Sequence, residues 1–378
     1  METDAEKIVT IARFPNNRAL LLQSRLQAEG IDCFLSHQNL LQAAVSSGVE
    51  IKVRHSDMDK ALRLIEQYKQ EQGSQKERSI KTLRSVRRIL VPVDYSEASE
   101  KAVSFALDLA DTLKAEIKLL HVYFNPVLDV APFDTSHTYQ INLSNYLHEI
   151  EQNARKQMAS IVVDLRKKAA GTKNKVKISF ALANGLAADE ILSLSHKYHP
   201  GLIVMGSRGM GKQSEGLLGS ITAKVVAKSA VPVIAIPESS KSLRIDKVKN
   251  VLYATDFDNY DQVALSRLIN LMHPFSATLH LVHVSIGVKK SWDKIKMDSL
   301  KKFIHDEFEK FPVKFKIMIS DDVVNGLESY MRENTIDVIA LTNHARGLIN
   351  SFFTPSVTKM IMQRINKPLF VFKAGREL

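Results

Sequence analysis

A glycine-rich stretch near the middle of the chain has the composition of a phosphate-binding loop. Residues 206–220 read GSRGMGKQSEGLLGS, in which Gly206, Gly209 and Gly219 precede Ser220. Glycine lets a backbone turn through positive φ and approach an anion closely, so several N–H groups can converge on it. A helix that begins at Gly219 and Ser220 adds free N–H groups and a dipole that favours negative charge. The stretch therefore predicts a site for a phosphorylated ligand.

Three side chains of this stretch are expected to assist. Arg208 and Lys212 can bring positive charge to a phosphate, and Ser220 is expected both to cap the helix and to donate to the phosphate. The stretch also fits the G-x4-G-K part of the P-loop of nucleotide hydrolases, but Gln213 stands where that loop needs Ser or Thr for magnesium. The pattern is better described as G-x2-G-x9-G-S.

The elements that must position this loop occur twice. "RRILVPVDYSEASEKA", from Arg87, resembles "KNVLYATDFDNYDQVA", from Lys249, and "LLHVYF" resembles "LVHVSI" at the same separation. Further along, "GLIVMGS" aligns with "IDVIALTN", and "VPVIAIP" aligns with "KPLFVFK". The chain therefore carries two copies of one module, and most of the residues that the second copy lacks fall opposite residues 126–173.

The order of elements predicts the fold class. Each copy alternates short apolar runs with helical patterns, which is typical of an α/β protein with a doubly wound parallel sheet covered on both faces. We place module 1 at residues 86–238 and module 2 at residues 247–376. Residues 1–72 read as a separate small α+β domain of ferredoxin-like type. In doubly wound sheets, ligands bind at the carboxyl ends of the strands where the strand order reverses.

Composition limits the possible functions. The chain has 378 residues, a formal net charge of +11 and a single cysteine, Cys33, which excludes an internal disulfide. Neither a signal peptide nor an apolar run long enough for a membrane span is evident, so we expect a cytoplasmic protein with no membrane partner. Much of the positive charge lies in linkers without interleaved aromatic residues, so nucleic acid is an unlikely partner.

The combination of motifs resembles the universal stress proteins of the ATP-binding kind. The resemblance rests on the G-x2-G-x9-G-S spacing, on "ILVPVDYSEAS", on "HVY" and on "VPVIAIP". It covers residues 87–237 closely and residues 249–373 more loosely. It implies a tandem universal stress protein whose modules have the adenine nucleotide alpha hydrolase-like fold. The leading residues resemble, more weakly, a small bacterial domain described as signal-transducing.

The resemblance also implies a ligand and a site. The ligand is ATP, with Mg²⁺ held mainly through phosphates and water. Asp94 falls on the ribose or adenine position, Val122 on the adenine position, and the loop on the ribose and triphosphate. With the two basic side chains of the loop, the expected site consists of Pro92, Val93, Asp94, Ser96, Val122, Met205, Gly206, Arg208, Gly209, Lys212, Gly219, Ser220 and Ile221.

Module 2 departs from this pattern and is expected to be a pseudo-site. It has Thr342, Ala345 and Pro355 where module 1 has its three glycines, although Asp256 and Ser356 are retained. A side chain at a left-handed position and a proline without an N–H together cost about 3 to 5 kcal/mol. That is on the order of 10²- to 10³-fold in affinity. An alternative for Asp94, and the favoured reading of Asp256, is that each caps the helix that follows.

No catalytic group stands out. His121 and His283 recur at equivalent strand ends and are expected to be packed or hydrogen-bonded rather than catalytic. We therefore expect a regulatory, ATP-binding protein with at most slow hydrolysis. A nucleotidyl-transfer enzyme lacks its expected His or Lys motif.

Two questions on assembly stay open at this stage. An interaction scaffold that binds no nucleotide is the alternative to the ATP-binding protein. The last strands of the family pair along sheet edges, so the resemblance implies that "VPVIAIP" and "KPLFVFK" pair and join the modules as an intramolecular pseudo-dimer. A homodimer and an unidentified protein partner are also possible, and the sequence names neither the stress nor the signal.

Overall fold

The computed structural model describes the chain as two compact units, Met1–Arg84 and Ser85–Leu378. They are treated separately below. The residues described are 8–14, 22–23, 26–27, 29–36, 49–65, 86–123, 137–209, 219–239, 244–257, 261–287, 291–344, 360–361 and 364–374.

The first unit is a small antiparallel sheet with helical segments. Its strands are β1 (Ile8–Phe14), β2 (Cys33–Ser36) and β3 (Val49–Arg54), paired in the order β1-β3-β2. A short 3₁₀ helix, η2 (His55–Asp57), leads into a helix that is described over residues 58–65. Cys33 is buried in the core of this unit, and burial raises the pKa of its thiol. A small α+β domain is confirmed, and its buried thiol fits a structural role.

Module 1 contributes five parallel strands to the second unit. Their order is β8-β7-β4-β5-β6, so the order reverses between β4 and β7. This is a doubly wound sheet, as predicted. The strands are β4 (Arg88–Pro92), β5 (Glu116–Tyr123), β6 (Ile178–Asn184), β7 (Leu202–Gly206) and β8 (Val233–Ile236).

Module 2 repeats this arrangement. Its parallel strands follow the order β11-β10-β9-β12-β13, which mirrors the order in module 1. A short 3₁₀ helix, η3 (Ile245–Lys247), precedes the first of them. The strands are β9 (Asn250–Ala254), β10 (Thr278–Ile286), β11 (Val313–Ser320), β12 (Val338–His344) and β13 (Leu369–Ala374).

Helices cover both faces of the sheet, which explains why the central strands are apolar throughout. On β4, Ile89 and Val91 belong to the core under α3, α4, α7 and α8, whereas Leu90 belongs to the core under α5, α6 and α9. None of the described helices has the length and apolar composition needed to cross a bilayer. The helices are α3 (Glu97–Leu113), α4 (His137–Ala170), α5 (Ala187–Tyr198), α6 (Ser220–Lys228), α7 (Asp261–Met272), α8 (Ser291–Glu307) and α9 (Val323–Glu333).

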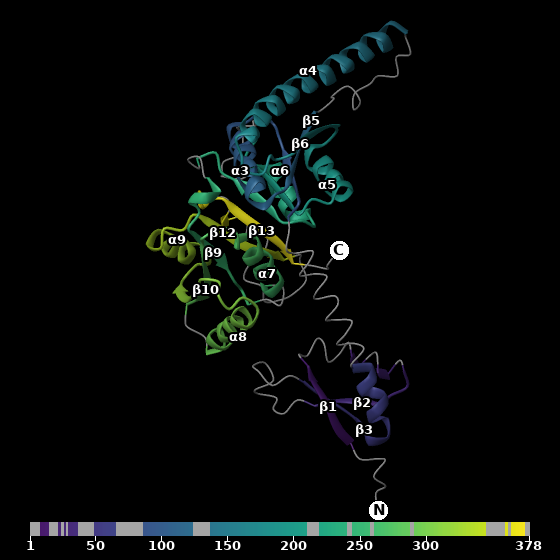
Figure 1. Cartoon of the computed structure of the whole chain (residues 1–378), viewed down its shortest axis with the longest axis vertical. Helices are drawn as coiled ribbons and strands as arrows, with labels where there is room; N and C mark the ends of the chain where they lie inside the picture. Colours follow the sequence, from purple (N-terminus) through teal and green to yellow (C-terminus); the bar gives the residue numbers. More distant parts are fainter. Residues whose placement is uncertain are drawn as a thin grey trace, which may run out of the picture. The chain divides into compact units, whose positions relative to one another are not determined.

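Most of the length difference between the modules lies in one pair of helices. α4 has 34 residues, whereas α8, at the same place in module 2, has 17. The buried apolar side chains described on α4 run from Ala154 to Ala169, and the helix extends past the sheet in Figure 1. The missing residues of module 2 therefore fall where the sequence alignment places them.

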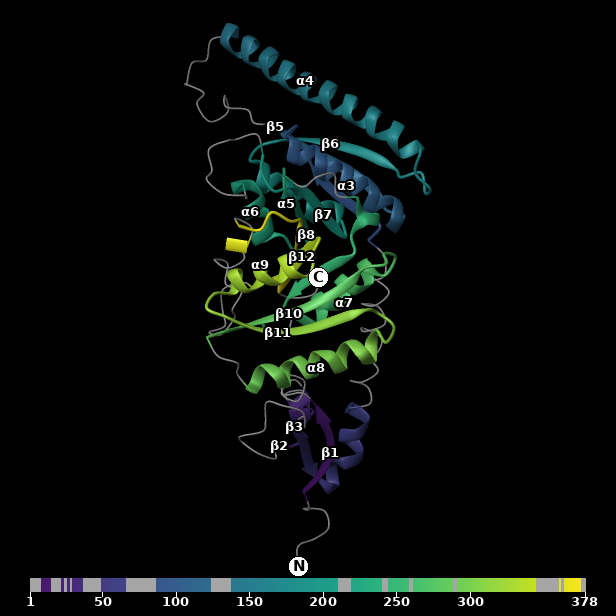
Figure 2. The ribbon, with the colours of Figure 1, turned by 90° about the vertical axis from the view of Figure 1, so that its left-hand side faces the viewer.

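The two modules share one continuous sheet, in which β8 pairs antiparallel with β13. The register sets Leu369 opposite Ala235 and Val371 opposite Val233, within the two segments expected to pair. In Figure 2 the strands run as one ladder between α4 and α8. Side chains add to this seam, since Asn343 Nδ2 donates to Val226 O at 3.5 Å and Lys373 Nζ donates to Lys228 O at 3.3 Å.

Candidate functional site

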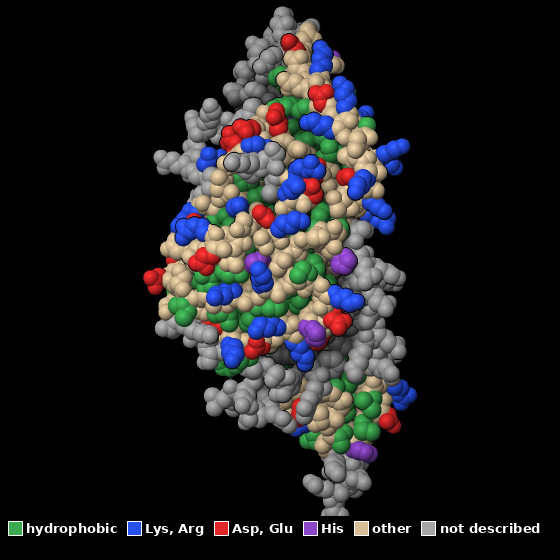
Figure 3. All heavy atoms as spheres, turned by 60° about the vertical axis from the view of Figure 1, so that its left-hand side comes forward, with side chains coloured by type: hydrophobic (Ala, Val, Ile, Leu, Met, Phe, Trp, Pro, Cys, Tyr) green, Lys and Arg blue, Asp and Glu red, His purple; other side chains and the backbone are tan. Residues whose placement is uncertain are grey.

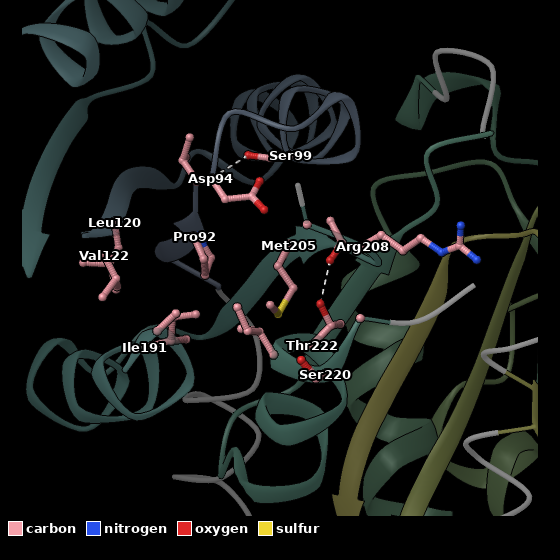
Figure 4. Close-up of a pocket in the computed structure, with 16 residues that line it drawn as sticks. Pro92, Asp94, Ser99, Leu120, Val122, Ile191, Met205, Arg208, Ser220 and Thr222 are labelled. Atoms are coloured by element: carbon pink, nitrogen blue, oxygen red, sulfur yellow. Dashed lines mark hydrogen bonds between the residues drawn. The ribbon is translucent and has the colours of Figure 1, made fainter. Parts of the chain in front are cut away.

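A cavity opens in module 1 where the strand order reverses. It lies at the carboxyl ends of β4, β5 and β7, and its volume is about 470 Å³, within the range of small-molecule sites (Figure 4). The sequence predicts a ligand at this place. The lining residues are Pro92, Val93, Asp94, Ser99, Leu120, Val122, Ala187, Ile191, Met205, Gly206, Arg208, Gly209, Gly219, Ser220, Ile221 and Thr222.

One half of the cavity is apolar. Leu120 and Val122 come from the end of β5, Ile191 comes from α5, and Met205 comes from the end of β7. Figure 4 shows Leu120, Val122 and Ile191 grouped on one side, with Met205 and Pro92 between them and the loop. Flat, mostly apolar ring systems fit such a surface.

Asp94 supplies a fixed carboxylate to the cavity. Its Oδ1 accepts hydrogen bonds from the Ser96 main-chain N–H at 3.1 Å and from Ser96 Oγ at 2.6 Å. Its own N–H donates to Ser99 Oγ at 3.3 Å. Tyr95, between them, has φ 65°, so the chain turns sharply after β4. The carboxylate is therefore held in place by the turn.

Ser96 positions Asp94 and does not line the cavity. Its Oγ accepts from the Ser99 N–H at 3.2 Å, which makes Ser96 the N-cap of α3. The alternative reading of Asp94 as that cap is therefore wrong, because the chain places the hydroxyl two residues later at the capping position.

Two described glycines of the loop, Gly206 and Gly209, are required for a different reason than the sequence suggests. Positive φ among the described glycines occurs at Gly30, Gly185 and Gly287, none of which belongs to the loop. A Cβ on Gly206 would instead lie 2.9 Å from the main-chain carbon of Ala98. A Cβ on Gly209 would lie 2.4 Å from Asp94 Oδ2. The prediction that these glycines are needed for positive φ is therefore wrong. They are needed because the loop approaches α3 and Asp94 too closely for a side chain.

The start of α6 closes the other end of the cavity. Its N-cap is Gly219, with φ −75° and no side-chain cap, so the expected capping role of Ser220 is wrong. The Gly219 N–H donates to Ser207 O at 2.7 Å, and the first bond inside the helix runs from Ala223 N to Gly219 O. The N–H groups of residues 220–222 therefore precede the helical ladder, as at any helix start.

Several lining residues escape the sequence argument. Thr222 Oγ1 donates to Gly206 O at 2.8 Å and so ties α6 to the end of β7. Ser99 is buried and holds the backbone of Asp94. Leu120 stands two residues before Val122 and so lies on the same face of β5. This spacing is the one feature of the sequence that could have identified Leu120 as a lining residue. Lys212 lies outside the described residues.

Arg208 belongs to the cavity mainly through its backbone. Its carbonyl oxygen accepts from Ser96 Oγ at 3.4 Å, and a Cβ on Gly219 would lie 3.4 Å from its Cα. In Figure 4 its guanidinium points away from the other labelled side chains. Among the expected site residues that Figure 4 labels, it alone turns its side chain out of the cavity.

Two histidines make the same bond in the two modules. His121 Nδ1 lies 2.8 Å from Val93 O, and His283 Nδ1 lies 2.8 Å from Thr255 O, so each ring donates to the residue before the strand-end aspartate. Both are hydrogen-bonded, as expected. In the described part of the chain, no group of three or more His, Cys, Asp or Glu side chains is arranged to hold a metal ion.

A polar network occupies the corresponding place in module 2. Tyr253 Oη donates to Asp261 Oδ1 at 2.7 Å and lies 2.6 Å from Thr342 Oγ1. Thr255 Oγ1 donates to the other carboxylate oxygen of Asp261 at 2.5 Å. Burial, and then the charge of Asp261, raise the pKa of Tyr253 well above its ordinary value. All four side chains are buried, and Thr342 stands at the position of Gly206.

Three further positions in the described part of module 2 are also buried. Val284, Val323 and Asp256 are buried, whereas their equivalents Val122, Ala187 and Asp94 are partly exposed. Ala345, Pro355 and Ser356 fall outside the described residues. Residues 258–260, just before the described start of α7, do so too, which leaves the capping role of Asp256 a prediction.

Comparisons with known proteins agree over most of the chain. The model of the universal stress protein family matches residues 85–237 and, again, residues 247–373. Universal stress protein YxiE of Bacillus subtilis is 33% identical over 149 residues, which is 39% of this chain and 97% of that protein. Universal stress protein MJ0577 of Methanocaldococcus jannaschii is 31% identical over 162 residues, which is 40% of this chain and 94% of that protein.

A solved structure extends the likeness in fold to both modules. The crystal structure of a universal stress protein from Archaeoglobus fulgidus aligns with a TM-score of 0.58 and 23% identity. The alignment covers 77% of this chain and 99% of that one.

Proposed function

Because the chain belongs to the universal stress protein family, we propose that module 1 binds ATP and that nucleotide occupancy regulates the protein in a stress response. The observation that carries this proposal is the composition of the cavity. An apolar surface, a fixed carboxylate and the start of a helix meet in one space at the switch point of the sheet. These are the three surfaces that a base, a ribose and a phosphate chain need.

The residues suggest how ATP lies. The adenine ring packs between Leu120, Val122 and Ile191, and the Asp94 carboxylate accepts from a ribose hydroxyl. The phosphates extend to the loop after β7 and to the N–H groups at the start of α6, where the helix dipole favours anions. Mg²⁺ is held through the phosphates and water, since the cavity offers no carboxylate cluster in its described lining.

Module 2 does not bind nucleotide in this proposal. The reason is not the one expected from the sequence, which was the loss of glycines at positions with positive φ. Thr342 and Asp261 are tied to Tyr253, so their polar groups are already satisfied inside the module. A nucleotide would have to break this buried network, and breaking a hydrogen bond to a buried charged group costs about 1.5 to 3 kcal/mol.

The function is regulatory rather than enzymatic in this proposal. The described lining of the cavity contains no His, Lys or Cys, and its one carboxylate is held by Ser96. That leaves no group placed as a general base for phosphoryl transfer. We also propose a cytoplasmic location and a protein partner. On the face drawn in Figure 3, Lys and Arg are scattered among other side chains, which gives no support to a nucleic-acid partner.

A direct test is to purify the full chain without added nucleotide, denature it, and identify the released small molecules by mass spectrometry. Titration calorimetry with Mg-ATP follows on nucleotide-free protein. We expect one ATP per chain and loss of binding in Ala187→Trp, which fills the cavity. His196→Trp, on the exposed surface of the same helix, is the matched control. Absence of both released nucleotide and binding heat would reject the proposal in favour of the nucleotide-free scaffold.

A further inference from the structure

Arg208 stands between two cavities. Arg208 lines the cavity of module 1, which we call the nucleotide cavity, and also lines a second cavity of about 400 Å³. We call the second one the seam cavity. It is lined by Glu97, Lys101, Ser207, Arg208, Glu238 and Ser239.

The guanidinium of Arg208 is poorly satisfied in the arrangement seen. Its Nε is buried and has no hydrogen-bond partner. The carboxylate of Glu97, in the same cavity, is bridged by Lys101 Nζ at 2.7 Å, and Lys101 Nζ also donates to Glu238 O. Leaving a buried donor of a charged group unpaired is costly, and a phosphate offers arginine a bidentate partner.

The backbone of Arg208 is fixed at the phosphate end of the nucleotide cavity. Ser96 donates to its carbonyl oxygen, and its Cα packs against Gly219, the N-cap of α6. The side chain can therefore change direction by rotation alone, without movement of the loop. An anion at the start of α6 would lie next to the Cα from which the guanidinium extends.

The seam cavity adjoins the junction of the two modules. Ser207 N–H donates to Ile236 O at 2.7 Å, which ties the loop to the end of β8. Ser239 Oγ donates to Asn366 Oδ1, three residues before β13 begins. A cation that enters or leaves this cavity therefore changes the charge beside the two strands that join the modules.

From these contacts we propose that Arg208 is a two-position switch that senses the phosphate chain. With the nucleotide cavity empty, the guanidinium lies in the seam cavity. With a di- or triphosphate bound, it turns to the distal phosphates and leaves the seam cavity to Lys101, Glu97 and Glu238. The site thereby distinguishes ATP and ADP from AMP, and it reports that difference to the β8–β13 seam. This inference rests on the proposed nucleotide site.

The first test compares AMP, ADP and Mg-ATP by titration calorimetry on the full chain. In Arg208→Gln we expect affinity for ATP to fall about 10- to 100-fold, and the ratio of ATP to AMP affinity to fall at least fivefold. Lys167→Gln, an exposed cation on α4, is the matched control and should leave this ratio unchanged. Arg208→Lys, which keeps the charge but not the fork, should give an intermediate ratio.

The second test uses a variant that is expected to raise, rather than lower, the affinity for ATP. Glu238→Gln removes a carboxylate from the seam cavity, so release of Arg208 becomes easier and affinity for ATP should rise severalfold. Glu100→Gln, an exposed carboxylate in the first turn of α3 outside both cavities, controls for the general loss of negative charge. Hydrogen exchange over residues 233–239 and 366–371 should change on binding of ATP, and this change should be absent with AMP and in Arg208→Gln.

The outcomes separate the two proposals. Failure of the wild-type chain to bind any adenine nucleotide would overturn both. Binding with an ATP to AMP ratio that Arg208→Gln does not change would overturn the switch and leave the nucleotide site standing. If ATP leaves hydrogen exchange in the β8 and β13 segments unchanged, the proposal that Arg208 transmits nucleotide binding to the junction with module 2 is overturned.

Discussion

The two modules place the same backbone around two different interiors. In both, a histidine donates to the carbonyl before the strand-end aspartate, and the residue after that aspartate has positive φ, 65° at Tyr95 and 63° at Phe257. Module 1 has a cavity beyond this turn, whereas the described side chains Tyr253, Asp261 and Thr342 of module 2 form buried hydrogen bonds at the corresponding place. The comparison teaches that the turn belongs to the fold, and that a few side chains decide whether it can hold a ligand.

Gly206 of module 1 and Thr342 of module 2 stand at the same position of the fold and play different parts. At Gly206, a side chain would collide with the start of α3, so glycine lets the loop and helix meet around a cavity. At the equivalent Thr342, the hydroxyl is used to satisfy a buried tyrosine. A buried polar network is stable only when each member has a partner. Returning a single residue of module 2 to glycine would therefore break the network without opening a site.

The largest effect is expected for Gly206→Ala. The new methyl group would lie 2.9 Å from the backbone of Ala98 and would push β7 away from α3. Overpacking of this kind costs about 1 to 3 kcal/mol, and we expect ATP affinity to fall on the order of 100-fold. Calorimetric titration and urea unfolding measure the two losses. The matched change in module 2, Thr342→Gly, should lower stability without adding a second nucleotide per chain; a second bound ATP would contradict the network argument.

Asp94→Asn should give the next largest effect. The amide keeps the shape of the side chain but removes the charge that accepts from a ribose hydroxyl, which is expected to lower ATP affinity about 10- to 100-fold. The equivalent Asp256→Asn should leave ATP affinity unchanged, as titration calorimetry can show. Equal losses in the two variants would mean that module 2 also takes part in binding.

Tyr253→Phe should destabilise the protein by about 1.5 to 3 kcal/mol, because Asp261 loses a donor inside the core. Tyr330→Phe is the matched control, since the Tyr330 hydroxyl pairs with His280 at 2.9 Å rather than with a carboxylate. Its cost should be nearer to 1 kcal/mol. Urea unfolding of the full chain compares the two. A smaller loss for Tyr253→Phe would show that the network contributes little.

The smallest of the four effects is a pH dependence from module 2. Burial lowers the pKa of His283 and of His280 below the ordinary value of 6.5. Well above that value both rings are neutral in the folded and the unfolded chain, so their protonation takes nothing from the free energy of unfolding. As the pH falls below 6.5 the unfolded chain takes up protons first, and stability is lost until the folded pKa is passed.

Urea midpoints at a series of pH values measure this loss. The variant His280→Gln/His283→Gln should flatten the dependence between pH 6.5 and the acid range. His196→Gln, at an exposed position on α5, should not. A dependence that survives the double variant would assign it to other groups.

Much of the candidate site could be predicted because its residues are local to strand ends. Pro92, Val93 and Asp94 follow one apolar run, and the loop after Met205 follows another, so the topology of a doubly wound sheet brings them together. Ser99 and Thr222 were missed because each acts on a residue that only the folded chain brings near. The reason for the glycines was also missed, since their neighbours on α3 lie about a hundred residues earlier in the sequence.

The sequence alone determined the repeat, the strands and helices, and the residue types at the carboxyl ends of β4 and β7. These features follow from local periodicity, because a side chain's face on a strand or helix depends only on its spacing from its neighbours. Only the tertiary structure decided that the Arg208 guanidinium points away from the other labelled side chains of the cavity and that Tyr253 bonds Thr342, 89 residues away. Such contacts depend on how separate elements pack, and packing is a property of the whole sheet and its helices.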